Sequence, residues 1–522
     1  MLPFLKNANV KSQKQIVAFR GINWSDRYQD GDLANSQNLS ARRFPYLSTR
    51  RARGEYGEYK GATAMTARDK VVLVQGTGQM VDGVEIANLL YDGNVVGQVT
   101  AGEKQFAVVN TKMIIWPDKV YLDMTDKKVK PLGAKAEVTG VKFSAEHGTM
   151  TATGGDKLAE YFRVGDGVHI SGTKQNDRAA VILDLTDTVL TIGTKDNANP
   201  IADEEVAGTV TVERRIPDLD FICESENRLW GCSNSAQTIY TSSWGDPTNF
   251  FVNEGLSTDS WAVAVGTEGE FTGCCKQGSS ILFWKETKLH KMLGSYPAEY
   301  SLYTYDIAGL KKGCHKSLQV INEVLYYVGL HGVYSYNGGV PNLISAALGD
   351  RVLTDAVAGT DGDGYYLSAI EGKIPHLLVY EIQTGMWIRE DGSHATDFGR
   401  IGKDLYFLTP SGYVYVADSR EADPDLFWTA QFCPFYETIQ GRKRYTKILL
   451  RVELPKGSWM RAQVRFDGGN WIACWRVHGR NADVLPLQIP INRCDCLELM
   501  LDGGGPCTIL AMQLEYQVGS EM

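Results

Sequence analysis

The sequence lacks long apolar runs, and no stretch approaches the 18 consecutive apolar residues of a transmembrane helix. Its first residues, MLPFLKNANVKSQKQIVAF, contain no apolar run long enough for a signal peptide. Long alanine- and leucine-rich segments are also missing, whereas Gly (54) and Tyr (25) are abundant. That balance favours strands and turns over helices. We therefore expect a strand-rich protein that is made and folded in a cytoplasm without membrane insertion.

Common catalytic and metal-binding motifs are absent as well. The ten cysteines form no CxxC pair: Cys274 and Cys275 are adjacent, and Cys494 and Cys496 are separated by one residue. We expect them to be reduced thiols buried in strands. The eight histidines are scattered, and the chain has no HExxH, GxSxG or Walker A sequence. The sequence therefore predicts a protein that is not an enzyme and holds no metal or cofactor.

Three short motifs resemble known sites only in part. FDGGNW (466–471) resembles the Asp-box of sialidases, but it occurs once and its spacing is one residue short, so we interpret it as a hairpin connection. Asp361-Gly-Asp363-Gly resembles the start of a calcium loop without the glutamate at position twelve, and a solvated turn is expected. The run Asp203-Glu204-Glu205 is expected to be an exposed loop.

The most informative feature is a meander that recurs about every forty residues where copies are adjacent. Each copy has an apolar strand, a short polar turn, a second apolar strand, a glycine-marked turn and a third strand. The turn before the second strand is Glu226-Asn227, Gly278-Ser279, Asn322-Glu323 or Gly402-Lys403 in the four clearest copies. The seven copies occupy residues 63–76, 106–124, 221–244, 271–294, 318–337, 364–390 and 396–418.

This period is that of four-stranded propeller blades. A single meander cannot bury both of its faces, and radial stacking buries them while leaving only short edges. The strands VVLV (71–74) and ILFW (281–284) are apolar throughout, as strands covered on both faces should be. The predicted fold is all-β, with a β-propeller of about seven blades; one or more β-sandwiches are the alternative. The blade count stays open, because the N-terminal segment could donate a closing strand.

The repeat is interrupted twice, which predicts five regions. Residues 133–213 differ in character, and Gly165-Asp166-Gly167 is expected to form a tight turn in a small β domain inserted into a loop. The polar segment SREADPD (419–425) marks a linker before a C-terminal β-sandwich. The predicted regions are an extended arm (1–57), blades one and two (58–132), the inserted domain (133–213), blades three to seven (214–424) and the sandwich (425–522).

The N-terminal arm is basic, although the chain has a net charge of −9. Arginine and aromatic residues together are typical of interface anchors, and arginine binds carboxylates through paired hydrogen bonds. We therefore predict that the arm is a strap between subunits; nucleic acid is the other candidate partner for such a stretch. The candidate interface residues are Trp24, Tyr28, Arg42, Arg43, Phe44, Tyr46, Arg50, Arg51 and Arg53.

The order of these regions resembles the tail-hub, or nozzle, proteins of tailed bacteriophages, also called packaged-DNA stabilisation proteins. The resemblance covers residues 18–130 and 214–520, with the insert outside the common pattern. It rests on Asn38, Pro45, Arg50 and Arg51 leading into a propeller, and on the blade NRLWGCSNSAQTIYTSSWGDPTNF (227–250), in which RLW is followed by IYTSSWGDP.

The resemblance implies a structural virion protein without catalysis, made in a host bacterium. Such proteins form a ring, usually of six copies, below the portal and adaptor proteins. The ring extends the DNA channel, retains the packaged genome and anchors fibres, a needle or a plug. Viral DNA passes through it without sequence-specific binding. Two alternatives are a carbohydrate-binding or glycan-degrading propeller and a cytoplasmic scaffold propeller, although the chain lacks the regular GH…WD signature of WD repeats.

Overall fold

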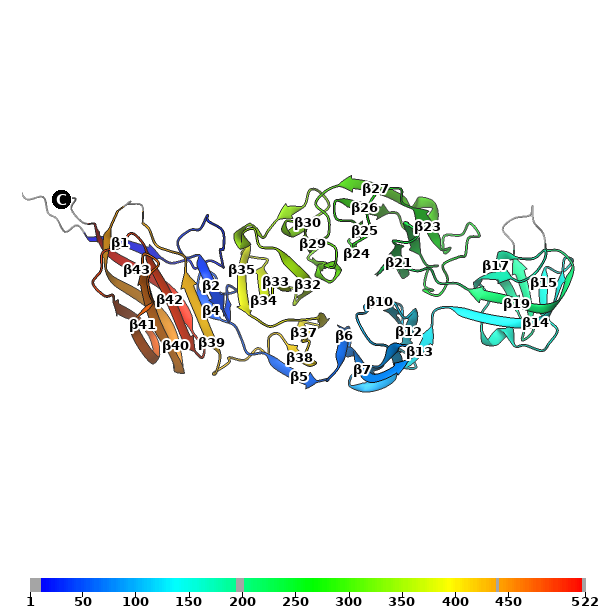
Figure 1. Cartoon of the computed structure of the whole chain (residues 1–522), viewed down its shortest axis with the longest axis horizontal. Helices are drawn as coiled ribbons and strands as arrows, with labels where there is room; N and C mark the ends of the chain where they lie inside the picture. Colours follow the sequence, from blue (N-terminus) through cyan, green and yellow to red (C-terminus); the bar gives the residue numbers. More distant parts are fainter. Residues whose placement is uncertain (1–10, 194–200, 438–440, 519–522) are drawn as a thin grey trace, which may run out of the picture. The chain divides into compact units, whose positions relative to one another are not determined.

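The computed structural model describes residues 11–193, 201–437 and 441–518, and nearly all of its regular structure is β-strand (Figure 1). The helices within these residues are four single 3₁₀ turns: η1 (Leu158–Glu160), η2 (Pro297–Glu299), η3 (His315–Ser317) and η4 (Ala346–Leu348). None of them has the length or the apolar character that a membrane-spanning helix needs. The chain divides into two compact units, residues 72–315 and residues 1–71 with 316–522.

Seven four-stranded antiparallel sheets are the blades of a β-propeller, and they follow the order of the seven sequence copies. The predicted all-β propeller is therefore confirmed. The blades are β6 (Ala62–Ala67), β7 (Val71–Val81), β8 (Val84–Tyr91), β9 (Asn94–Thr100); β10 (Gln105–Val109), β11 (Lys112–Trp116), β12 (Val120–Asp123), β13 (Lys128–Pro131); β20 (Phe221–Ser225), β21 (Arg228–Ser233), β22 (Thr238–Thr241), β23 (Trp261–Ala264); β24 (Gly273–Gln277), β25 (Ser280–Trp284), β26 (Lys288–Leu293), β27 (Ser301–Asp306); β28 (Gln319–Ile321), β29 (Val324–Gly329), β30 (Gly332–Tyr336), β31 (Asn342–Leu343); β32 (Leu353–Thr360), β33 (Gly364–Glu371), β34 (Ile374–Glu381), β35 (Met386–Asp391); and β36 (Asp397–Ile401), β37 (Asp404–Leu408), β38 (Tyr413–Val416) with β5 (Gly54–Glu58).

The polar turns and the apolar strands explain why each copy folds as a blade. Asn322 and Glu323 have φ values of 49° and 67°, as a tight two-residue hairpin turn requires. Every residue of β25 is buried, because both faces of its blade are covered. Between the third and fourth blades, Trp230 and Phe283 pack with ring centroids 6.4 Å apart.

The last blade takes its fourth strand from the N-terminal segment. Strand β5 pairs with β38 in an antiparallel register that places Tyr413 opposite Glu58 and Val416 opposite Gly54. The sequence had left this donation open. It completes the last blade without adding an eighth.

The inserted small β domain is a closed barrel with the strand order β14-β15-β18-β17-β16-β19. Its strands are β14 (Ala134–Ser144), β15 (Thr149–Ala152), β16 (Gly167–Ser171), β17 (Arg178–Leu185), β18 (Val189–Gly193) and β19 (Glu204–Arg214). Gly165 has a φ of 90° in a turn closed by a hydrogen bond from the Asp166 N–H to the Arg163 carbonyl. The prediction of an exposed loop over residues 203–205 is wrong from Glu204 onward, because β19 begins there. The Glu204 carboxylate accepts the N–H groups of Lys174 and Gln175.

After Asp425 the chain forms one nine-stranded sheet, to which the N-terminal arm contributes four strands. The bounds are β1 (Lys11–Ile16), β2 (Leu33–Gln37), β3 (Leu39–Ser40), β4 (Leu47–Thr49), β39 (Phe427–Phe432), β40 (Lys443–Phe466), β41 (Ile472–Gln488), β42 (Leu497–Gly504) and β43 (Thr508–Val518). Strand β40 pairs with β43 along its first half and with β42 along its second. FDGGNW connects β40 to β41, with Asp467 and Gly468 at φ 48° and 70°. The arm's share in this sheet was not foreseen, because hydrophobic alternation does not reveal pairing between residues that lie nearly 400 to about 500 positions apart.

Candidate functional site: an arginine-lined cavity in the arm

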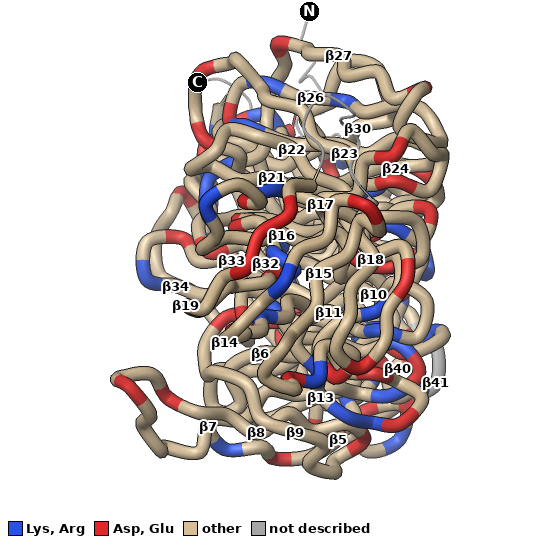
Figure 2. Tube along the Cα trace, turned by 90° about the vertical axis from the view of Figure 1, so that its right-hand side faces the viewer, with Lys and Arg blue, Asp and Glu red and all other residues tan. Residues whose placement is uncertain are grey.

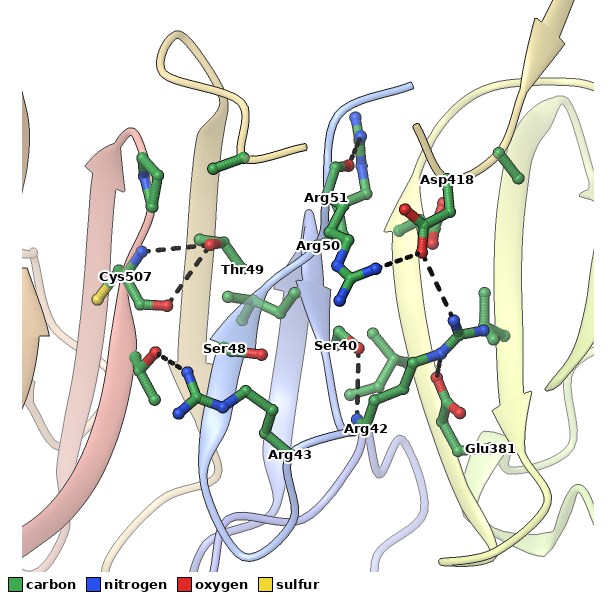
Figure 3. Close-up of a pocket in the computed structure, with 18 of the residues that line it drawn as sticks. Ser40, Arg42, Arg43, Ser48, Thr49, Arg50, Arg51, Glu381, Asp418 and Cys507 are labelled. Atoms are coloured by element: carbon green, nitrogen blue, oxygen red, sulfur yellow. Dashed lines mark hydrogen bonds and ion pairs between the residues drawn. The ribbon is translucent and has the colours of Figure 1, made fainter. Parts of the chain in front are cut away.

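Four of the arm's arginines, Arg42, Arg43, Arg50 and Arg51, line one cavity of about 780 Å³ in the unit made of residues 1–71 and 316–522 (Figure 3). The cavity is lined by the hairpin β3–β4, by blade residues and by the C-terminal sheet. Besides these arm arginines, its polar lining includes Ser48, Thr49, Asp363, Tyr366, Glu381, Glu390, Asp418, Arg420, Glu453 and Thr508.

The hairpin positions Arg42 and Arg43, because its strands pair with each other and β4 also pairs with the C-terminal sheet. Leu39 pairs with Thr49 across the hairpin, and Leu47 pairs with Ile509 of β43. The connecting residues form two turns, closed by hydrogen bonds from the Phe44 N–H to Ala41 O (3.0 Å) and from the Tyr46 N–H to Arg43 O (2.9 Å). Adjacent side chains in this loop therefore leave in different directions, Arg42 toward the blade and Arg43 toward the C-terminal sheet (Figure 3).

Arg42 is bound to the blade of β32–β35. Its guanidinium forms an ion pair with Asp361, donates to Glu381 Oε1 at 3.2 Å and donates to the Tyr366 hydroxyl at 2.9 Å. Asp361 also accepts the N–H groups of Asp363 and Gly364. The Asp-Gly-Asp-Gly segment forms the expected turn, and Asp363 is exposed, but the expectation of solvation is wrong for Asp361, whose carboxylate is a partner of Arg42.

Arg53 and Arg50 extend this network along the arm. Arg53, whose side chain is only 12 % exposed, contacts Asp391 at 2.6 Å and Glu390 at 2.8 Å. Burial lowers the pKa of Arg53, but the two carboxylates outweigh it and the net pKa is raised. Arg50 donates to the side-chain oxygen of Asn38 at 2.7 Å. We call Arg42, Arg50 and Arg53 the inner arginines.

The carboxylates of the network differ in their protonation. Burial raises the pKa of Glu381 to about 6, because Arg42 is shared with Asp361 and cannot fully offset the loss of solvent. Burial acts in the same direction on Asp361 and Asp391, but Arg42 and Arg53, respectively, together with backbone N–H groups, lower their pKa values below the usual range. The site therefore contains one carboxyl group that titrates in mildly acidic solution.

Arg43 and Arg51 face solvent instead. Their side chains are 54 % and 59 % exposed, and their nearest carboxylates, Glu453 and Asp418, are 3.7 Å and 3.6 Å away. Arg43 also donates to the Thr508 hydroxyl at 3.0 Å. Ion pairs this exposed contribute little to stability, so these two side chains are available to another molecule.

The four predicted aromatic anchors also divide into two that contact their own chain and two that are exposed. Trp24 donates its indole N–H to Ala34 O and lies 4.0 Å from the Arg351 guanidinium, and burial raises the pKa of Tyr28 to about 12 beside Tyr436. Phe44 and Tyr46 are 45 % and 39 % exposed. We call Arg43, Phe44 and Tyr46 the arm tip. The structure thus gathers only part of the predicted interface set on a free surface, and the interface itself stays a prediction.

The cavity is arranged for ion pairing, and its charged side chains mostly neutralise one another. Across the described residues, no group of three or more His, Cys, Asp or Glu side chains could hold a metal ion. None of the ten cysteines is in a disulfide bond. His290 is buried between the hydroxyls of Thr267 and Thr304, and burial lowers its pKa to about 4.

Sequence reasoning missed the carboxylates that bind the inner arginines. The only usable signals were the acidic surplus of the chain and the Asp-Gly-Asp-Gly segment, which was assigned to solvent. The arm itself has ten basic and four acidic residues in positions 1–57, a net +6 within a chain of −9. Along the rest of the chain, acidic and basic residues are interspersed, as the view toward β14–β19 shows (Figure 2).

No family model and no curated protein matches the chain. Among solved structures, BamB from Moraxella catarrhalis has a TM-score of 0.30 at 10 % identity, covering 71 % of this chain and 97 % of that one. An exo-beta-1,3-galactanase from Phanerochaete chrysosporium with galactose has 0.23 at 10 %, covering 55 % and 92 %. An acylaminoacyl peptidase has 0.32 at 9 %, covering 74 % and 59 %. Such scores carry no argument about function.

Proposed function

We propose that the chain is a structural virion protein of a tailed bacteriophage. Copies form a tail-hub or nozzle ring that extends the DNA channel below the portal and adaptor, retains the packaged genome and anchors distal tail parts. The observation that carries this proposal is the arm. It is built into both the C-terminal sheet and the last blade, yet it presents the arm tip and Arg51 to solvent. A rigid body with an outward basic and aromatic surface suits assembly.

Charge supports a channel that DNA passes without being held. Each phosphate that Lys or Arg neutralises adds salt-sensitive affinity, which would slow ejection. With a net +6 in residues 1–57, the rest of the chain carries −15. The arginines Arg42 and Arg53 are taken by carboxylates of the same chain and are not free to bind phosphate. We propose no catalytic role for the cavity.

Electron microscopy of the purified protein and of virions tests the proposal. We expect a closed ring with a central channel whose lining is acidic or neutral. In a separate binding assay, the purified ring should not bind double-stranded DNA at physiological salt. A chain that remains monomeric in virions, or a channel lined by arginine, would contradict the proposal. A purified protein that turned over glycans would contradict the non-enzymatic assignment.

A further inference from the structure

A second cavity, of about 300 Å³, lies in the unit of residues 72–315, where the loop 242–260 of the blade β20–β23 meets the barrel turn at Arg163–Asp166. Its lining includes three exposed apolar side chains, Val164, Trp244 and Leu256. Trp244 is 56 % exposed, which is unusual for a tryptophan in a folded domain. Exposed apolar groups gathered around a concave site mark a binding surface. We call it the Trp244 cavity.

The walls of the Trp244 cavity are fixed by hydrogen bonds. Arg228 is buried and donates to three carbonyls of the loop, those of Ser242, Ser257 and Asp259, at 2.5–2.8 Å. On the barrel side, Arg163 donates to Asp246 at 3.1 Å. A loop held this way loses little conformational entropy when a partner binds.

The charged lining is acidic and leaves one carboxylate available. It contains Arg163 and four acidic residues. Asp166 pairs with Arg214, Asp246 pairs with Arg163, and Asp259 accepts the N–H groups of residues 254–256. Glu254 is exposed, and no ion pair with another described residue engages its carboxylate. The cavity thus offers apolar and aromatic surface next to a free negative charge.

The arm tip has the complementary character, with two exposed aromatic rings beside the exposed cation Arg43. We propose that the arm tip of one copy docks in the Trp244 cavity of the next copy, with Arg43 bound to Glu254. This inference rests on the proposed ring. A ring needs a heterologous interface, in which two different surfaces of the chain meet, and the tip and the cavity are such a pair. Aromatic and arginine side chains are also the residues that dominate interface energies.

Mass photometry of two double variants tests the pairing. F44A/Y46A removes the tip and W244A/L256A removes the cavity, so each protein alone should remain largely monomeric, with contact affinity reduced roughly tenfold or more. An equal mixture should form dimers, because each variant keeps the surface that the other lacks. The control Y303A/Y305A removes two comparably exposed tyrosines from β27 and should assemble like the wild type.

Charge reversal provides a second test that does not touch packing. R43E and E254R should each weaken assembly, and the combined R43E/E254R chain should recover it. Unchanged thermal unfolding confirms that each variant folds, and if an alanine variant does not fold, the charge pair alone decides. If all single and double variants formed rings like those of the wild type, this inference would be wrong, but the proposed ring would stand. A wild-type chain that never assembles would overturn the proposed function as well.

Discussion

Arg42 and Arg43 are neighbours in the chain but lie in opposite environments, and the contrast extends to the inner arginines and the arm tip as groups. Arg42 forms ion pairs with Asp361, Glu381 and, at 3.8 Å, Asp418, and it donates to a tyrosine hydroxyl. Arg43 is more than half exposed, and its carboxylate partner is 3.7 Å away. A basic sequence therefore does not act as one surface. One part of it fastens the arm to its own chain, and the other part is left for a partner.

The largest expected effect is from Arg53. R53A should lower the free energy of unfolding by roughly 3 kcal/mol, because Glu390 and Asp391 stay largely buried and lose the guanidinium that contacts both of them. Urea denaturation measures the change. R51A, which removes an exposed arginine from the same segment, is the matched control. Equal losses of unfolding free energy in both variants would contradict the distinction between inner and exposed arginines.

R42A should cost somewhat less, roughly 2 kcal/mol, since it removes charged hydrogen bonds from a side chain that is still about a third exposed. The two acids that it leaves, Asp361 and Glu381, then repel each other. Thermal unfolding near pH 7 reads the loss, with R43A as the neighbouring control. A stable R42A protein would show that the arm is held by its strands alone.

Glu381 should give the network a pH dependence. The folded protein keeps its proton up to about pH 6, whereas the unfolded chain releases it near 4.5. The stabilisation from this proton is complete below pH 4.5 and is lost as the pH rises to about 6. The unfolding free energy of wild type relative to E381Q should therefore fall across that window, by at most about 2 kcal/mol.

The lowered pKa values of Asp361 and Asp391 predict the opposite slope at lower pH. The stability that these two ionised carboxylates contribute is present above about pH 3.8, and it is lost as the pH falls through their folded-state pKa values. The measured quantity is the difference in unfolding free energy between wild type and E381Q. If that difference changed in a single transition across both pH ranges, the assignment of the mildly acidic titration to Glu381 would be wrong.

The smallest expected effect on stability is that of R43A and R51A, each within about 0.5 kcal/mol, because exposed ion pairs contribute little. Differential scanning calorimetry should give melting temperatures near that of the wild type. R43A should nevertheless weaken assembly of the ring, so a variant with normal melting and reduced ring formation would sharpen the contrast between the two groups.

The blades could be predicted from sequence because each is a local meander. Its turns, such as Asn322-Glu323, and its apolar strands, such as β25, are signals that a short stretch of sequence carries by itself. For the same reason, only the arginine side of the site could be predicted, and its carboxylate partners could not. The arm's composition indicated contact, but Arg42 and Glu381 are 339 residues apart, and nothing local pairs them. Glu204 was misassigned because its carboxylate caps backbone N–H groups of a distant loop instead of facing solvent.

The donated strand β5 also imposes an order on biosynthesis. Its partner β38 is encoded more than 350 residues later, so at a synthesis rate of about 5–20 residues per second the ribosome needs roughly 20–70 s to deliver it. During that interval β5 has exposed backbone donors and acceptors and no native neighbour. The last blade of each nascent chain can therefore close only late in translation, and chaperones that shield extended segments have a long opportunity to bind this strand.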